Sequence, residues 1–100
     1  MPMEKLFVYG TLKDPVVQKT VFGRIVEGIP DSLDGYRKTE IAMSDGVFPI
    51  IIRESGSAVD GLILEVTREE LALIDRYETD AYRRVRVTLK SGQEAWVYCE

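Results

Sequence analysis

The hydrophobic residues of this chain form short extended runs separated by turn-forming residues, a pattern typical of strands. Three such runs lie in the first two thirds of the chain, at residues 4–9, 47–52 and 59–66. Gly10 ends the first run, and Glu54-Ser55-Gly56-Ser57 predicts a turn between the other two. Pro49, inside the second run, indicates an edge strand or a bulge. Glycine, proline and aspartate punctuate residues 24–46, which predicts short irregular strands joined by turns.

A strictly alternating stretch marks the C-terminal part of the chain. Its two faces are Arg83, Val85, Val87 and Leu89 on one side, and Tyr82, Arg84, Arg86 and Thr88 on the other. This alternation predicts a half-buried strand. Ser91-Gly92 then predicts a two-residue hairpin turn into a last strand over residues 95–99.

Two segments carry helix signals. The first begins at Pro15, where a first helical turn accepts proline, and is closed by Gly23. The second has Thr67 as its N-cap, and Glu70 three residues later completes a capping box. This second helix should end near residues 77–79.

The order of these elements predicts the α+β fold class. One hundred residues correspond to one domain, which spans residues 1–100. Gly10, Gly35, Gly61 and Pro49 are residues that permit strands to bend sharply. We therefore expect strands that curl into a small barrel or a strongly bent sheet, with short helices packed outside.

Composition predicts a cytoplasmic globular protein. Apolar residues make up 45% of the chain and charged residues 30%, which are ordinary values. The longest apolar stretch, residues 47–52, is far shorter than the roughly 20 residues of a membrane-spanning helix. Residues 1–6 lack the features of a signal peptide, and the single cysteine, Cys99, cannot form an internal disulfide.

Charge and missing residue types exclude several classes of function. The net charge of -4 disfavours a nucleic-acid or anionic-membrane surface, although Arg83-Arg84-Arg86 is a local basic cluster. The chain has no histidine, so catalytic schemes built on a Ser–His or Cys–His pair are excluded. It also lacks a phosphate-binding loop and the usual zinc ligands. We therefore expect neither a metal nor a cofactor.

Glu78 is the first candidate for chemistry. Leu71, Ile74 and Glu78 fall within about 60° of one another around the predicted helix, so the carboxylate extends an apolar stripe. Burial there would raise the pKa of the carboxyl group and make it a proton shuttle near neutral pH. The alternatives are that Glu78 lies in solvent or pairs with Arg83 or Arg84. Asp75, on a neighbouring arc, is the other possible working group.

The turn Tyr9-Gly10-Thr11-Leu12 is the second candidate. A glycine directly after a strand lets the backbone approach a ligand closely. Successive amides in such a turn can converge on an anion or a developing oxyanion. The alternative is a simple turn, because many strands end at glycine.

The face that carries Tyr82, Arg84 and Arg86 is the third candidate. It would present a hydroxyl group and guanidinium groups to a carboxylate substrate, or it is a solvent-facing strand surface. Trp96 and Tyr98 share a face of the last strand, and we expect both to pack against the core.

These motifs together resemble the γ-glutamylcyclotransferase superfamily, over about residues 6–98. The resemblance rests on Tyr9-Gly10-Thr11-Leu12, Ile74-Asp75-Arg76-Tyr77-Glu78, Phe48-Pro49-Ile50 and Asp60-Gly61-Leu62. The spacing from Glu78 to Tyr82 and then to Arg84 is also similar to that of the family. The short γ-glutamylamine cyclotransferase branch is the most similar. Members often carry glycine directly after the catalytic glutamate, where this chain has Thr79.

The resemblance implies a small mixed β-barrel with flanking short helices. It also implies a γ-glutamyl amide or peptide substrate whose α-amine attacks its own γ-carbonyl, which releases 5-oxoproline and an amine. Glu78 would be the general acid and base, and Tyr9, Gly10, Thr11 and Leu12 would bind the substrate. Tyr82 and Arg84 would shape the pocket. The alternative function is a non-catalytic small-molecule-binding or protein-interaction module on the same fold. The leaving amine and the oligomeric state are left open.

Overall fold

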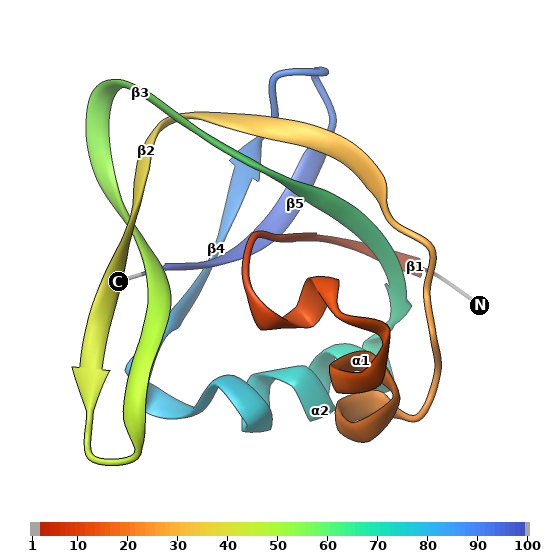
Figure 1. Cartoon of the computed structure of the whole chain (residues 1–100). Coiled ribbons are helices and arrows are strands. Elements are labelled where there is room, and N and C mark those ends of the chain that lie inside the picture. The colour runs from red at the N-terminus through yellow and green to blue at the C-terminus, as the bar shows by residue number, and fades with distance from the viewer. Residues whose placement is uncertain (1–2, 100) are drawn as a thin grey trace.

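The computed structural model describes residues 3–99, which form a curled five-stranded sheet with two short helices (Figure 1). The strands are β1 (Met3–Val8), β2 (Ile29–Met43), β3 (Gly46–Thr67), β4 (Arg83–Thr88) and β5 (Glu94–Cys99). The helices are α1 (Pro15–Phe22) and α2 (Arg68–Glu78), with short 3-10 turns η1 (Thr11–Lys13) and η2 (Thr79–Ala81). The order across the sheet is β2-β3-β1-β5-β4, and β1 runs parallel to β5 whereas the other pairs are antiparallel. The predicted α+β fold with a small, mixed, barrel-like sheet is confirmed.

β1 is the central strand, and its C-terminal half is buried on both faces. Leu6 and Val8 pack with Ile74 of α2, on the side that the helices cover. Phe7 and Tyr9 pack on the other face, inside the curl of the sheet. A segment that is covered on both faces needs apolar residues at successive positions, which explains the uninterrupted apolar run Leu6-Phe7-Val8.

β2 and β3 form one long bent ribbon, which corrects the prediction of short irregular strands. The turn predicted at residues 54–57 is also wrong as a strand boundary, because β3 continues through it. The pairing register shifts between Asp34 and Tyr36, opposite residues 54–57. Gly35 and Gly56 have φ angles of 83° and 87°, a region that favours glycine, and they bend the ribbon without ending it. The arm beyond the bend, seen at the left of Figure 1, ends in the hairpin tip at residues 43–46.

Pro49 lies inside this arm, opposite Glu40. Its carbonyl oxygen accepts a hydrogen bond from the Tyr82 hydroxyl at 2.6 Å, so its backbone polar groups face away from β2. The missing N–H of proline therefore costs no hydrogen bond within the ribbon. The expectation of an edge position at Pro49 is confirmed.

The connection between β4 and β5 is longer than the predicted two-residue turn. It spans residues 89–93, with a hydrogen bond from the Gly92 amide to the Leu89 carbonyl and another from the Leu89 amide to the Gln93 carbonyl. Gly92 has a φ of 93°. A turn followed by a glycine at positive φ is a common longer hairpin connection.

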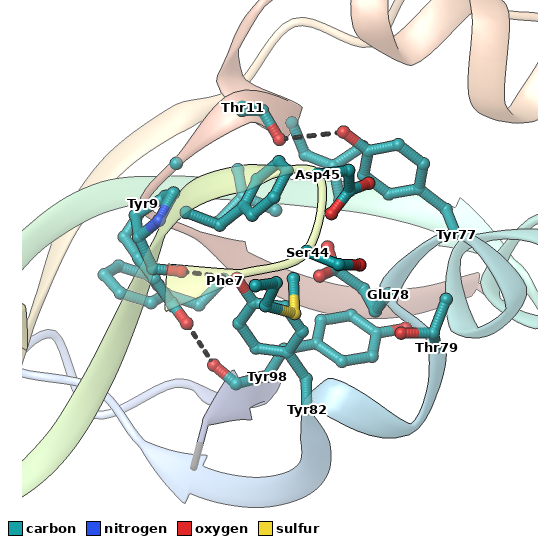
Figure 2. Close-up of a pocket in the computed structure, with 16 residues that line it drawn as sticks. Phe7, Tyr9, Thr11, Ser44, Asp45, Tyr77, Glu78, Thr79, Tyr82 and Tyr98 are labelled. Atoms are coloured by element: carbon teal, nitrogen blue, oxygen red, sulfur yellow. Dashed lines mark hydrogen bonds between the residues drawn. The ribbon is translucent and has the colours of Figure 1, made fainter. Parts of the chain in front are cut away.

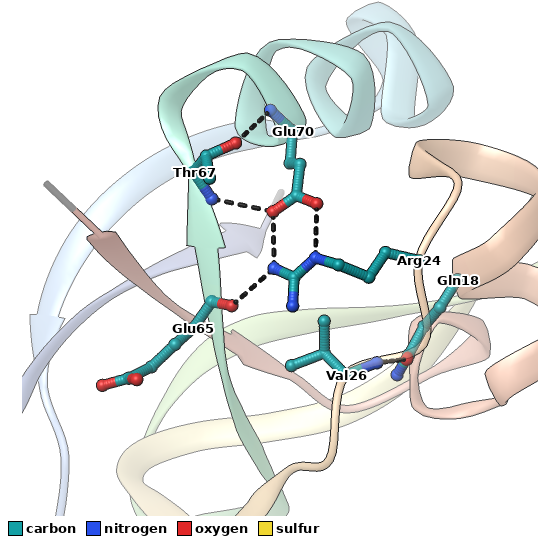
Figure 3. Close-up of polar contacts among 6 residues, drawn as sticks. All are labelled: Gln18, Arg24, Val26, Glu65, Thr67 and Glu70. Carbon is teal, nitrogen blue, oxygen red and sulfur yellow. Dashed lines mark hydrogen bonds and ion pairs between the residues drawn. The ribbon is translucent and has the colours of Figure 1, made fainter. Parts of the chain in front are cut away.

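Both helices begin and end where the sequence predicts. Asp14 caps α1 through the Val16 amide at 2.8 Å, and Gly23 closes it in the left-handed conformation. Thr67 and Glu70 form the predicted capping box at the start of α2 (Figure 3). Arg24 binds both carboxylate oxygens of Glu70, at 2.7 and 2.8 Å, and so ties the segment after α1 to α2. Within residues 3–99, neither helix has the length and hydropathy to cross a bilayer.

Candidate active site

A cavity of about 280 Å³ lies where three segments meet: the turn after β1, the tip of the β2–β3 hairpin and the C-terminal end of α2. These segments are far apart in the sequence and meet because β1 lies next to β3 while the β2–β3 ribbon bends back over it (Figure 1). Among the residues that the structure describes, aromatic rings, two carboxylates and backbone groups line the space, and neither lysine nor arginine does. Such an enclosed space with few polar groups is typical of a small-molecule site.

Glu78 extends from the last turn of α2 into this cavity (Figure 2). It follows Leu71 and Ile74 on the buried stripe of the helix, as predicted. Burial raises the pKa of Glu78 to about 7, and the nearby charge of Asp75 adds to this rise. The side chain therefore exchanges a proton near neutral pH, where both its acid and its base forms are populated.

Asp75 has a different role from Glu78. Its carboxylate accepts hydrogen bonds from Arg84 Nε at 2.9 Å and from the Tyr98 hydroxyl at 2.6 Å. It does not line the cavity. Because Arg84 pairs with Asp75, the alternative in which Glu78 pairs with Arg84 is wrong. Glu78 is therefore the carboxylate of this helix end that faces the cavity.

The turn from Tyr9 to Leu12 forms the opposite wall of the cavity. Tyr9 is buried, and its hydroxyl donates to the main-chain carbonyl of Tyr98. Burial raises the pKa of the Tyr9 hydroxyl, which therefore stays protonated. A Cβ atom at Gly10 would lie 2.7 Å from Pro49 Cγ, so only glycine allows the turn to pack against the hairpin arm.

The way this turn begins leaves backbone amides that can donate hydrogen bonds to a ligand. Thr11 starts the 3-10 turn η1, and the first amides of such a turn have no partner within it. The Leu12 carbonyl is held by the buried side chain of Gln18 at 2.8 Å. Gln18 also accepts a hydrogen bond from the Val26 amide at 2.8 Å (Figure 3). The position of the turn is thus fixed from within the core.

Tyr82 lines the cavity as predicted, and its hydroxyl is bound to the Pro49 carbonyl. Burial, followed by the charge of Glu78, raises the pKa of this hydroxyl. Arg84 does not line the cavity. Its guanidinium group lies over the Trp96 ring, 4.3 Å from the centroid, besides its pair with Asp75. Arg84 thus touches the site only through the helix end that carries Glu78.

Thr79 follows Glu78 in a backbone conformation that side chains disfavour. Its φ is 61° and its ψ is -164°, a region that is populated almost only by glycine. This conformation turns the chain from α2 into η2 directly beside the carboxylate. It gives a physical reason for the glycine that the family pattern places after the glutamate.

The sequence did not indicate every residue of the cavity. Ser44 and Asp45 lie at the hairpin tip and Tyr77 lies beside Glu78, and all three line the space (Figure 2). The Tyr77 hydroxyl is 3.1 Å from the Thr11 hydroxyl and links α2 to the turn across the cavity. Tyr98 packs in the core as predicted but also lines the cavity. Asp45-Gly46 was visible as a turn, but its place over the site depends on the bend of the ribbon.

The described residues contain no group of three or more Asp, Glu or Cys side chains that are placed to hold a metal ion. The carboxylates of the site are Glu78 and Asp45, and the other polar groups are hydroxyls and amides. The arrangement can transfer a proton at Glu78 and can donate hydrogen bonds from the turn on the opposite wall.

Comparisons of sequence give a consistent picture. A family model described as gamma-glutamyl cyclotransferase, AIG2-like, matches residues 6–100. AIG2-like protein C of Arabidopsis thaliana is 30% identical over 83 residues, which are 82% of this chain and 47% of that protein. AIG2-like protein A of the same plant is 30% identical over 88 residues, which are 87% of this chain and 52% of that protein. The chain spans about half the length of these curated relatives.

Solved structures share the fold. The solution structure of At5g39720.1 from Arabidopsis thaliana has a TM-score of 0.85 and 26% identity, and it covers 99% of this chain and 69% of that chain. A structure described as gamma-glutamyl cyclotransferase has a TM-score of 0.75 and 14% identity, with 98% of this chain and 66% of that chain covered. At that identity the second likeness concerns the fold alone.

Proposed function

Because this chain belongs to the AIG2-like gamma-glutamyl cyclotransferase family, we propose that it converts γ-glutamyl amides or peptides into 5-oxoproline and a free amine. The observation that carries the proposal is the position of Glu78. Its carboxyl group has a pKa of about 7 and lies across a small cavity from the Tyr9–Leu12 turn. Glu78 and the Tyr9–Leu12 turn thus line one small cavity, where they would act as a proton-transferring group and as a set of backbone donors.

The proposed reaction begins with the substrate folded so that its α-amine approaches its own γ-carbonyl carbon. The Glu78 carboxylate accepts a proton from the α-ammonium group, and the freed amine attacks the γ-carbonyl carbon. A C–N bond forms, and the carbonyl oxygen becomes an oxyanion. Glu78 then gives this proton to the amide nitrogen and takes a second proton from the ring nitrogen, which is cationic after the attack. The intermediate collapses with cleavage of the original C–N bond, and the amine that leaves receives the second proton from Glu78. The products are 5-oxoproline and the free amine, with no water consumed.

The turn on the opposite wall supports this reaction as a set of hydrogen-bond donors. Its backbone can approach the substrate closely at Gly10, and its amides would donate to the oxyanion or to the α-carboxylate of the substrate. Tyr82 would shape the pocket, because its hydroxyl is already bound to Pro49 and its ring lines the cavity. Arg84 would act as a positioning residue, because it holds Asp75 one turn before Glu78.

The experiment that tests this proposal measures 5-oxoproline release from a panel of γ-glutamylamines and γ-glutamyl peptides by mass spectrometry. We expect Glu78→Gln to lower turnover by about 10²–10⁴-fold, the usual contribution of a general acid and base. Glu69→Gln, an exposed glutamate near the start of the same helix, is the matched control and should leave turnover unchanged. Turnover by Glu78→Gln at the wild-type rate would contradict the role of Glu78.

The same experiment separates catalysis from simple binding. A non-catalytic small-molecule-binding module would be stabilised by γ-glutamyl compounds, because a ligand that binds only the folded state raises its stability. It would release no 5-oxoproline from any compound of the panel. That combination of results would replace the proposed activity with the binding function.

A further inference from the structure

Two strand edges face each other across a groove that is separate from the cavity of Glu78. Within residues 3–99, β4 pairs with β5 on one side and has no strand on the other. Residues 46–53 of β3 pair with β2, whereas β1 pairs with β3 only at residues 62–67. A groove of about 560 Å³ lies between these two edges, with Ile51 of β3 and Val85 of β4 among its walls. In Figure 1 the start of β4 lies beside the arm of the ribbon that contains these β3 residues.

Among the described residues, three arginines line this groove and no acidic residue does; Glu100, which follows Cys99 in its wall, lies outside the described residues. Arg53 comes from β3, and Arg83 and Arg86 come from β4, and all three are exposed. Within residues 3–99, none of the three forms an ion pair, whereas the guanidinium groups of three other arginines do: Arg24, Arg37 and Arg84. A chain with a net charge of -4 thus gathers in one groove three positive charges that form no ion pair within residues 3–99.

Aromatic rings hold two of these arginines in place. The Arg53 guanidinium group lies over the Tyr36 ring, 6.0 Å from the centroid, and that of Arg86 lies over the Trp96 ring at 5.2 Å. Such contacts orient a guanidinium group and leave its N–H donors free for an anion. They also occupy faces of the rings on which a nucleic-acid base would stack.

The fold therefore places the arginines of the basic cluster, Arg83, Arg84 and Arg86, in two different regions. Arg84 pairs with Asp75 beside the cavity, while Arg83 and Arg86 join Arg53 at the groove. Arg83 and Arg86 lie on opposite faces of β4, because side chains alternate along a strand. A run of consecutive acidic residues in an extended peptide also presents its carboxylates to both faces, and so matches this arrangement.

We propose that this groove binds an extended acidic segment of a partner protein, which adds as a strand to the edge of β4. The backbone of the segment pairs with the free edge, and its carboxylates bind Arg53, Arg83 and Arg86. The half-buried side chain of Val85 forms part of the wall against which the added strand packs, above the buried Ile51. This interaction is independent of the proposed cyclotransferase activity.

The experiment measures the fluorescence anisotropy of a labelled hexaglutamate peptide at low salt. We expect the wild type to bind it, although the net charges of protein and peptide repel each other. The triple variant Arg53→Gln, Arg83→Gln, Arg86→Gln should bind about tenfold more weakly or worse, because it loses three exposed charge pairs. The matched control removes three exposed arginines outside the groove, Arg37→Gln, Arg68→Gln and Arg76→Gln, and should bind as the wild type does.

Two further probes separate strand addition from general attraction to anions. A hexaglutamate that is N-methylated at alternate amides cannot pair fully with a strand edge, so we expect it to bind more weakly. A thymidylate hexamer carries similar charge without a peptide backbone, and we expect it not to bind. Failure of the wild type to bind hexaglutamate, or equal binding of either of these probes, would overturn the proposal. Unchanged binding by the triple variant, or by Arg86→Gln alone if the triple variant does not fold, would overturn it as well.

Discussion

At the scale of single residues, Glu78 makes the folded protein less stable when it ionises. Its pKa is about 7 in the folded protein and 4.5 when unperturbed. Between these values the folded state binds more protons than the unfolded state, so the free energy of unfolding falls as the pH rises. Above about pH 7 the full cost remains, on the order of 1–3 kcal/mol. Below pH 4.5 both states are protonated and the cost disappears.

Removing this charge should therefore stabilise the protein in alkaline solution. We expect Glu78→Gln to raise the free energy of unfolding by about 1–3 kcal/mol at pH 8 and by little at pH 4, because a neutral amide carries no ionisation cost. Urea denaturation at the two pH values measures the difference. Glu69→Gln, at an exposed position, should show no such pH dependence. A variant that is no more stable than the wild type at pH 8 would show that Glu78 is not held in a desolvated place.

Thr79 is a second residue whose effect on stability can be measured directly. Its φ of 61° with a ψ of -164° costs about 1–3 kcal/mol for a residue with a Cβ atom. Thr79→Gly should relieve this strain, and about 1 kcal/mol should remain as a gain after the higher chain entropy of glycine is subtracted. Thr79→Ala keeps the Cβ atom and should bring no such gain. Chemical denaturation of both variants makes the comparison, and equal stabilities would contradict the strained conformation.

At the scale of elements, Gln18 joins α1 to the turn before it and to the segment after it. Its side chain is 1% exposed and is bound to the Leu12 carbonyl and the Val26 amide. Gln18→Met would leave both backbone groups unpaired in the core, which should lower the free energy of unfolding by about 2–4 kcal/mol. Lys19→Met, at the exposed neighbouring position, should change it little. Thermal and urea denaturation test the difference, and a cost no larger than that of Lys19→Met would contradict it.

The elements that the sequence predicts correctly are those with local signals. Asp14, Pro15 and Gly23 mark α1, and the pair Thr67 and Glu70 marks the start of α2, because caps act within one turn of the chain. The long β2–β3 ribbon could not be predicted, since its continuity through residues 54–57 depends on pairing with a distant strand. Local propensity alone favours a chain reversal there.

The candidate site shows the same difference between residues with local sequence signals and residues placed by tertiary contacts. Glu78 and the Tyr9–Leu12 turn were visible, because a carboxylate on an apolar stripe and a glycine after a strand are local patterns. Asp45 lines the cavity because the ribbon bends back over β1. Arg84 lies outside the cavity, where it pairs with Asp75. Both placements depend on tertiary contacts that no spacing in the sequence encodes.

At the scale of the whole molecule, the fold separates its charges into two regions of opposite sign. Among the described side chains, the cavity is lined by two carboxylates without a lysine or arginine, and the groove beside β4 by three arginines without a carboxylate. The β2–β3 arm forms a wall of both, through its tip at the cavity and through Ile51 and Arg53 at the groove. The net charge of -4 therefore describes neither region.

The position of β1 in the sheet has a consequence for how this protein folds. Among the five described strands β1 comes first in the sequence, but its neighbours in the sheet are the end of β3 and the fifth strand, β5. Contacts between such distant parts of a chain form slowly, because a long loop must close before they are gained. The turn after β1 and Glu78 therefore come together only after β1 has paired with residues 62–67 of β3, which lead into α2. A nascent chain that stops before β5 holds every residue of the Tyr9–Leu12 turn but lacks one of the two strands that hold β1 in place.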